Sequence, residues 1–254
     1  MSNFVYLLGP AGCGKSTLTS VLYDTMKGSG LEVLTVNLDP GVEWLPYTPE
    51  IDIRKYISLR EVMREFRLGP NGALVVSVDL IVDHLPKLRE TISAWNPDYV
   101  LVDTPGQMEL FAFRDTGARI AERLAEESKA IVYLFDSVFC RDPLNYVMNM
   151  FIASAISTRF LLPQVPALSK ADLLSEEEIE MITGWSEDPL LLEDALDSRL
   201  EGLDRILSQD MMDIINRLGL EFNPMPISSR TYDGFGWLYS ELTRILTRGE
   251  KFTL

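Results

Sequence analysis

Residues 9–17 read G-P-A-G-C-G-K-S-T and fit the phosphate-loop pattern G-x-x-x-x-G-K-[ST]. The apolar run F-V-Y-L-L-G, which leads into this stretch, predicts a strand, and residues 15–28 have helical periodicity. A strand, a glycine-rich turn and a helix in this order bind phosphate through backbone N–H groups and the dipole of the helix N-terminus. The stretch therefore predicts a P-loop NTPase fold and a nucleoside triphosphate ligand.

Short apolar runs alternate with longer helical ones along the rest of the chain. The expected strands lie at 32–38, 99–103, 130–136, 165–169 and 225–229, and the expected helices at 58–68, about 78–95, 118–127, 145–157 and 234–248. The strand runs are apolar on both faces, as in buried parallel strands. We therefore predict an α/β fold with a mostly parallel central sheet and helices on both faces.

An acidic, amphipathic stretch at about 175–219 interrupts this alternation. It opens with Ser175 and Glu178, which form a capping-box pattern. It is either a solvated helical face or a lid or partner surface. One domain spanning 1–254 with this helical insertion is the simplest division.

Bulk composition excludes several classes of protein. The net charge of −15 argues against direct nucleic-acid binding. Two cysteines, Cys13 and Cys140, and one histidine, His84, do not allow a disulfide framework or a histidine-based metal site. We expect no signal peptide and no membrane span, and hence a cytoplasmic location.

Phosphate and metal roles follow from the loop and from two strand ends. Lys15 is expected to reach the β- and γ-phosphates, and the Ser16 hydroxyl to hold Mg²⁺. Asp103 ends a strand at the ligand edge of the sheet and is expected to complete the magnesium site. Asp39 also ends a strand and is expected to approach the metal or the attacking water. The remaining residues of the loop expected to contact nucleotide are Gly12, Cys13, Gly14 and Thr17.

The turn D-T-P-G-Q at 103–107 follows the Asp103 strand. The Gly106 N–H is expected to meet the γ-phosphate, which would let the turn sense that group. Gln107 either orients the attacking water or lies on the surface of the switch.

The stretch S-K-A-D at 169–172 indicates guanine. Asp172 can accept hydrogen bonds from guanine N1–H and N2–H₂, which adenine does not offer, and the stem of Lys170 can pack on the base. Ser169 stands where such proteins carry Asn, and we expect its shorter side chain to tie this loop to the phosphate loop less well. Ser228 and Ser229 fall where a second base-contacting loop is expected.

The tetrapeptide G-P-N-G at 69–72 by itself predicts a turn, with Pro70 setting φ and Asn71 tolerating positive φ. Placed between the Asp39 turn and D-T-P-G-Q, however, it makes the whole set resemble the GPN-loop GTPases. The resemblance covers nearly the whole chain.

The resemblance implies an enzyme that hydrolyses GTP to GDP with Mg²⁺ and forms dimers, in which Gly69, Pro70 and Asn71 of one subunit approach the phosphate site of the other. Asn71 would then act in trans, beside Lys15, Asp39 and Gln107 as catalytic residues. It also implies an assembly or chaperone-like role toward a protein client, which for eukaryotic members is related to RNA polymerase. A single short chain of this kind resembles the homodimeric archaeal members.

Two alternatives stay open at this point. The first is an ATP-using small-molecule kinase on the same scaffold, with Arg60, Arg64 and Arg67 over the phosphates. The second is a nucleotide-binding protein without turnover. Nucleotide selectivity and turnover distinguish these two alternatives from the GTPase and from each other.

Overall fold

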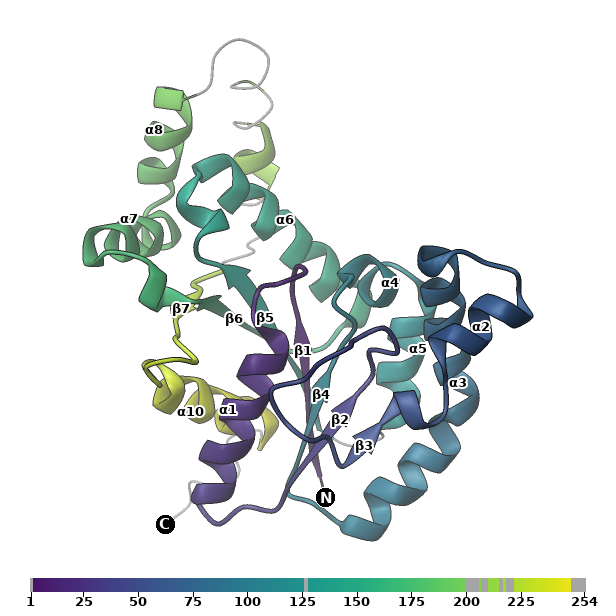
Figure 1. Cartoon of the computed structure of the whole chain (residues 1–254). Coiled ribbons are helices and arrows are strands. Elements are labelled where there is room, and N and C mark those ends of the chain that lie inside the picture. The colour runs from purple at the N-terminus through teal and green to yellow at the C-terminus, as the bar shows by residue number, and fades with distance from the viewer. Residues whose placement is uncertain are drawn as a thin grey trace.

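The computed structural model describes residues 2–125, 128–199, 206, 210–214, 217 and 222–247. Its centre is a sheet of seven strands in the order β3-β2-β4-β1-β5-β6-β7, and every pairing is parallel (Figure 1). The strands are β1 (Asn3–Leu8), β2 (Val33–Asn37), β3 (Ile51–Asp52), β4 (Tyr99–Asp103), β5 (Lys129–Asp136), β6 (Gln164–Ser169) and β7 (Met225–Pro226). The predicted α/β class is confirmed.

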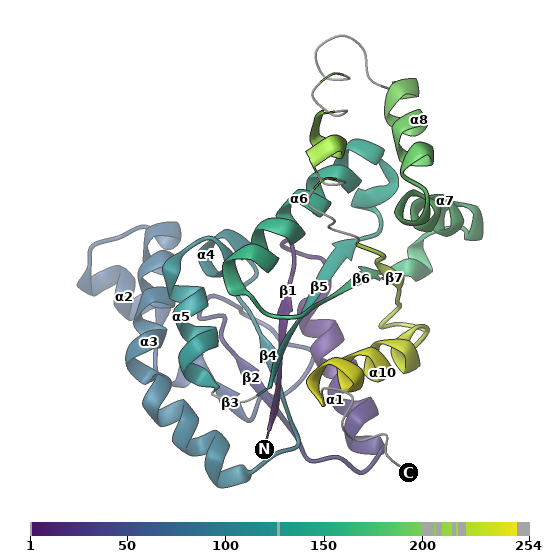
Figure 2. The ribbon, with the colours of Figure 1, turned by 180° about the vertical axis from the view of Figure 1, so that it is seen from behind.

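Helices cover both faces of the sheet. One face carries α1 (Lys15–Gly28) and α10 (Phe235–Leu246), and the other carries α3 (Pro70–Trp95), α5 (Asp115–Leu124) and α6 (Pro143–Phe160), as Figure 2 shows from behind. Shorter helices are α2 (Leu59–Glu65), α4 (Met108–Ala112), α7 (Glu176–Glu187) and α8 (Pro189–Arg199), with 3₁₀ turns η1 (Ile53–Lys55), η2 (Phe139–Arg141) and η3 (Ala171–Leu173).

The apolar runs divide into two cores, one on each side of the sheet. In β1, Phe4, Tyr6 and Leu8 pack toward α3, α5 and α6. Val5 and Leu7 alternate with them and pack toward α1 and α10. A strand that is buried on both faces has to be apolar throughout, which explains the continuous runs in the sequence.

The predicted insertion at about 175–219 begins with two described helices. α7 opens with the expected capping box, in which Ser175 and Glu178 hydrogen-bond each other's backbone N–H. It is followed by α8, and both lie beyond the carboxyl ends of β6 and β7 (Figure 1). The rest of the insertion, apart from residues 206, 210–214 and 217, lies outside the described residues, so its role stays a prediction.

Helix α3 differs from the prediction at its start. It begins at Pro70 instead of near Val78, so G-P-N-G is not a turn. Gly69 is the N-cap residue, and Pro70 occupies the first helical position, where its missing N–H costs nothing. Arg67, two residues before the Gly69 cap, has a φ of 55°, in the left-handed region. Asn71 is not among the described residues with positive φ.

In the part of the chain that the structure describes, we find no helix that is both long and apolar enough to cross a membrane.

Candidate functional site

The phosphate loop links β1 to α1 and depends on three glycines with positive φ. The φ angles of Gly9, Gly12 and Gly14 are 153°, 76° and 98°. A Cβ on Gly9 would lie 2.8 Å from the Leu134 carbonyl oxygen, so no larger residue fits there. Gly14 caps α1 from the left-handed region and leaves the first N–H groups of the helix free of side-chain caps. The loop therefore has the backbone geometry of an anion site.

Lys15 is held inside this loop. Its Nζ donates to the carbonyl oxygens of Gly9 at 2.8 Å and Pro10 at 3.0 Å, and the residue is only 5% exposed. Cys13 is buried beside it, and burial raises the pKa of its thiol, which disfavours the reactive thiolate. Cys13 therefore behaves as a small packing residue of the loop.

Asp103 ends β4 next to the phosphate loop and is 1% exposed. Burial raises the pKa of its carboxyl to about 6, while the nearby Ser16 and Tyr47 hydroxyls act in the opposite direction. Tyr47 donates to Oδ2 at 2.9 Å, whereas the buried Oδ1 has no hydrogen-bond partner. An unpartnered carboxylate oxygen near a serine hydroxyl is a fitting place for a hard cation.

A cation here would need ligands from the nucleotide. Among the described residues, no group of three or more His, Cys, Asp or Glu side chains is arranged to hold a metal. Mg²⁺ is commonly bound by one or two protein oxygens together with substrate phosphates and water. Ser16 and Asp103 therefore suit magnesium that arrives with a triphosphate.

Asp39 joins two of the predicted turns. Its Oδ1 accepts the Gly41 N–H at 2.8 Å, and its Oδ2 accepts the Gly106 N–H at 2.9 Å. The N–H that we expected to meet the γ-phosphate is thus bonded to Asp39 in this structure. The negative charge of Asp39 also raises the pKa of Asp103, so the two carboxylates are neighbours. Whether Asp39 approaches metal or water stays a prediction.

A buried polar network stabilises the Asp39 turn. The Asn37 side chain contacts Asp39 through two hydrogen bonds and donates to Asp52 at 2.9 Å. Asp52 forms an ion pair with Arg54 at 2.7 Å, and Arg54 in turn donates to the Val42 carbonyl. The network fixes both ends of the segment that carries Tyr47.

The base-site residues meet the phosphate loop around a cavity of about 160 Å³. Lys170 forms an ion pair with Asp136 at 2.6 Å, which holds its stem along the cavity. Besides residues from 169–173, 227 and 229–230, the walls include Cys13, Gly14, Thr17 and Leu18. The sheet order explains the meeting, because β1, β5 and β6 are adjacent and all end at this edge.

Two serines at this site make contacts that the motifs do not predict. Ser169 does tie the two loops, since its hydroxyl donates to the Cys13 carbonyl at 2.8 Å and lies 3.1 Å from the Phe135 carbonyl. The close approach of β6 to the phosphate loop makes a longer side chain unnecessary. The Ser228 hydroxyl donates to Asp172 Oδ1 at 2.7 Å, and Ser228 itself is not among the residues that line the cavity, so its contact with a base stays a prediction. Ser229 does line the cavity.

The G-P-N segment and Gln107 lie apart from these contacts. Gly69, Pro70 and Asn71 are exposed, and the Asn71 side chain makes no hydrogen bond to any described residue. Gln107 is exposed at the N-cap of α4 without a side-chain cap. Within the described residues, neither side chain hydrogen-bonds the phosphate loop of its own chain.

Sequence reasoning missed Tyr47, Asn37 and Thr104. Thr104 donates to the Leu7 carbonyl at 2.6 Å and ties the D-T-P-G turn to β1. A polar Asn at the end of an apolar strand was a usable signal for Asn37. Nothing local in the sequence points from Tyr47 to Asp103, which is 56 residues away.

Comparison with known proteins agrees with this geometry. A family model described as a conserved hypothetical ATP binding protein matches residues 7–248. The chain is 37% identical to GPN-loop GTPase PAB0955 of Pyrococcus abyssi, covering 91% of this chain and 92% of that protein. It is 33% identical to GPN-loop GTPase 3 of Mycosarcoma maydis, covering 97% of this chain and 92% of that protein.

A solved structure extends the similarity to three dimensions. The crystal structure of PAB0955 from Pyrococcus abyssi, described as a GTPase in apo form, matches with a TM-score of 0.84 at 34% identity. The match covers 96% of this chain and 97% of that one.

Proposed function

The chain belongs to the GPN-loop GTPases, which bind and hydrolyse GTP, and we propose that it does so as a magnesium-dependent homodimer. In this dimer, residues 69–71 of one subunit act at the nucleotide of the other. The observation that carries the proposal is that the phosphate loop and the S-K-A-D loop share one cavity, while Asn71 is exposed and unpaired within the described residues.

The chemistry of the cavity favours guanine over the adenine named in the family model's description. Asp172 is the carboxylate of this cavity, and Ser228 already holds its Oδ1. A carboxylate accepts hydrogen bonds from two N–H groups of guanine. Adenine presents an acceptor at N1, so the carboxylate oxygen that faces N1 would have no donor. We therefore assign GTP and GDP as ligands.

Magnesium, when bound, would neutralise charge on the β- and γ-phosphates. Ser16 and Asp103 would hold it in this proposal, because Asp103 Oδ1 is buried without a partner. Lys15 leaves its carbonyl partners and pairs with the phosphate oxygens. Asp39 and Gln107 position the attacking water, and the Asp39 bond to Gly106 yields when the γ-phosphate takes that N–H.

The trans role of Asn71 rests on topology and exposure. Because α3 returns the chain to parallel strand β4, its N-terminus lies at the carboxyl edge of the sheet, on the same side as the phosphate loop (Figure 1). Leu74, one helical turn from Asn71, lies against Gly41 in the Asp39 turn. A second copy facing this edge would receive the Asn71 amide near its own phosphates.

The dimer works as a switch in this proposal. GTP and GDP favour different arrangements because only GTP competes with Asp39 for the Gly106 N–H. We place a protein client on the insertion, where α7 and α8 expose Met181, Leu190 and Leu191. The protein is then an assembly or chaperone-like factor located in the cytoplasm.

The test is GTP hydrolysis by the wild type and by Asn71→Ala, with nucleotide binding measured for both and ATP as a second substrate. We expect normal GTP binding by the variant and a turnover about 10²-fold lower, which is the cost of losing one donor to transition-state charge. Equal rates would remove Asn71 from the mechanism. Faster hydrolysis of ATP than of GTP would overturn the base assignment.

A further inference from the structure

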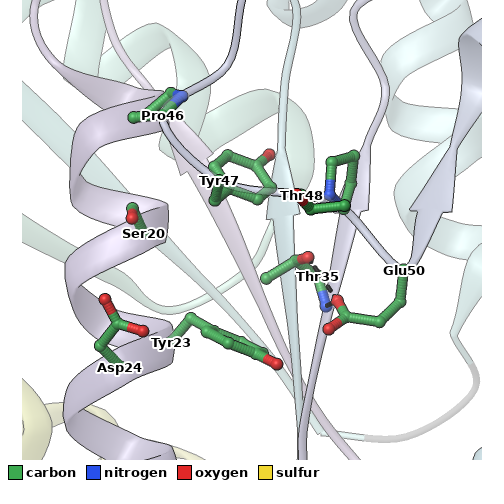
Figure 3. A pocket seen from close by; sticks show the side chains of 9 residues that line it. Ser20, Tyr23, Asp24, Thr35, Pro46, Tyr47, Thr48 and Glu50 are labelled. Atoms are coloured by element: carbon green, nitrogen blue, oxygen red, sulfur yellow. Dashed lines mark hydrogen bonds between the residues drawn. The ribbon is translucent and has the colours of Figure 1, made fainter.

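A short segment, residues 46–50, connects the Asp39 turn to β3 and lies over a cavity of about 440 Å³ (Figure 3). The other walls of this cavity are formed by α1 through Ser20, Tyr23 and Asp24, and by Thr35 of β2. Neither the sequence motifs nor the roles assigned above involve this segment. It nevertheless carries Tyr47, whose hydroxyl bonds the carboxylate assigned to magnesium.

The segment is anchored through Glu50 at its C-terminal end and is restricted by two prolines. Glu50 Oε2 accepts two hydrogen bonds from the buried Thr35, one from its N–H at 2.8 Å and one from its hydroxyl at 2.5 Å (Figure 3). Pro46 and Pro49 flank Tyr47 and Thr48, and each proline fixes its own φ angle. Tyr47 therefore projects from a stretch of chain that has little freedom to move.

Tyr47 restrains one of the two Asp103 oxygens. Its hydroxyl lies 2.9 Å from Oδ2, while Oδ1 has no hydrogen-bond partner. A phenol hydroxyl carries its proton at neutral pH, so Tyr47 is the donor and the Asp103 carboxylate is the acceptor. A carboxylate fixed through one oxygen cannot rotate freely, and its other oxygen then keeps one direction.

We propose that Tyr47 is a positioning residue for the magnesium site, which holds Asp103 so that Oδ1 is presented to the cation beside Ser16. The inference rests on the proposed use of Mg²⁺. Partners of this kind orient metal ligands, and their loss typically lowers metal affinity about 10- to 100-fold. Tyr47 touches neither the nucleotide nor the cation in this account.

The test uses Tyr47→Phe, which keeps the ring and removes only the donor. Tyr23→Phe is the matched control, because Tyr23 lines the same cavity but its hydroxyl accepts from Lys27 at 2.7 Å. Two quantities are measured: GDP affinity with Mg²⁺ and with EDTA, and the Mg²⁺ concentration that gives half-maximal GTP hydrolysis.

For Tyr47→Phe we expect unchanged GDP affinity in EDTA and a loss of most of the affinity gained from Mg²⁺. The half-maximal Mg²⁺ concentration rises about tenfold or more, and kcat recovers at saturating Mg²⁺. Tyr23→Phe matches the wild type. If Tyr47→Phe also matches the wild type, the inference is wrong. If the wild type itself does not depend on Mg²⁺, the proposed function fails first.

A double variant separates positioning from packing. In an Asp103→Asn background, Tyr47→Phe should change the Mg²⁺ requirement no further, because the effect runs through the same carboxylate. An additive loss would assign Tyr47 to packing alone. If Tyr47→Phe does not fold, Glu50→Ala frees the other end of the segment and should raise the Mg²⁺ requirement in the same direction. A wild-type requirement in that variant would overturn the inference.

Discussion

Ser169 shows how a short side chain can do the work expected of a longer one. It carries a hydroxyl where an asparagine amide was expected, yet it bonds the Cys13 carbonyl of the phosphate loop directly. The bond is buried and connects two loops that lie 156 residues apart in the chain. The base loop and the phosphate loop therefore share one rigid contact.

We predict that Ser169→Ala weakens GDP binding about three- to tenfold and lowers the free energy of unfolding by about 1–3 kcal/mol, because a buried carbonyl loses its donor. Ser240→Ala is the matched control, since its hydroxyl bonds the helix backbone on the exposed face of α10. Isothermal titration with GDP and urea unfolding measure the two effects. Identical affinities for the two variants would show that the tie does not matter for binding.

At this scale, sequence identifies residue types better than their bonds. Lys15, Asp103 and Asp172 follow from local motifs, and the structure places them around the expected edge of the sheet. The bond from Ser228 to Asp172 does not follow from any motif, because it depends on the ends of two strands meeting in space. The approach of Tyr47 to Asp103 has the same origin, and no spacing rule encodes it.

Among the elements, α3 is the most instructive difference. Glycine and proline usually mark turns, so the sequence predicts a turn at G-P-N-G. The same residues also suit a helix start, with glycine at the N-cap and proline at the first helical position. The apolar run after them then belongs to the helix, and Asn71 becomes an exposed residue of its first turn. Sequence alone does not separate these two readings.

The close packing of α4 against α5 predicts that Gly117 cannot be replaced by a larger residue without loss of stability. A Cβ on Gly117 would lie 1.8 Å from the Phe111 carbonyl oxygen, so the two helices must separate to accept it. We expect Gly117→Ala to lower the free energy of unfolding by about 3 kcal/mol or more. Gly28→Ala in α1 is the control, because a Cβ there meets no atom within 4 Å. Equal unfolding midpoints in urea would contradict the packing argument.

The buried network of Asn37, Asp52 and Arg54 predicts that the free energy of unfolding depends on pH. Burial alone would raise the pKa of Asp52, but hydrogen bonds from Arg54 and Asn37 outweigh it and lower that pKa below its ordinary value. A carboxylate with a lowered folded pKa contributes stability that is present above its unfolded pKa and is lost as pH falls through the folded value. We therefore expect Asp52→Asn to be less stable than the wild type near neutral pH.

The same variant should lose less stability than the wild type as the pH falls below about 4, because it no longer takes up that proton. Urea unfolding across this range measures the slope, and the exposed Asp24→Asn on α1 is the control. Parallel curves for wild type and Asp52→Asn would show that Asp52 does not contribute to acid sensitivity.

For the whole molecule, the alternation of apolar runs was sufficient to predict the parallel sheet and its two covered faces. The family was also evident from the set of motifs and is shown by relatives that match over almost the full chain. The homodimer is different, because it depends on surfaces that face another copy. Asn71 is exposed at the carboxyl edge of the sheet, which supports a homodimer but does not show which surface of the second copy meets it.

The central claim is that Asn71 completes the site of the opposite subunit, and mixing two inactive variants tests it most directly. Lys15→Ala loses the phosphate lysine but keeps Asn71, whereas Asn71→Ala keeps an intact phosphate loop. With free exchange of subunits, half of the dimers in an equimolar mixture are mixed, and each has one complete site. GTP hydrolysis should then recover to about a quarter of the wild-type rate.

A mixture of Asn71→Ala with the double variant Lys15→Ala/Asn71→Ala is the control and should stay inactive, because no subunit offers the trans amide. Recovery in the first mixture alone is the result that the account predicts. If the first mixture hydrolyses GTP no faster than the sum of its separate components, while subunit exchange is confirmed, Asn71 does not act across the dimer.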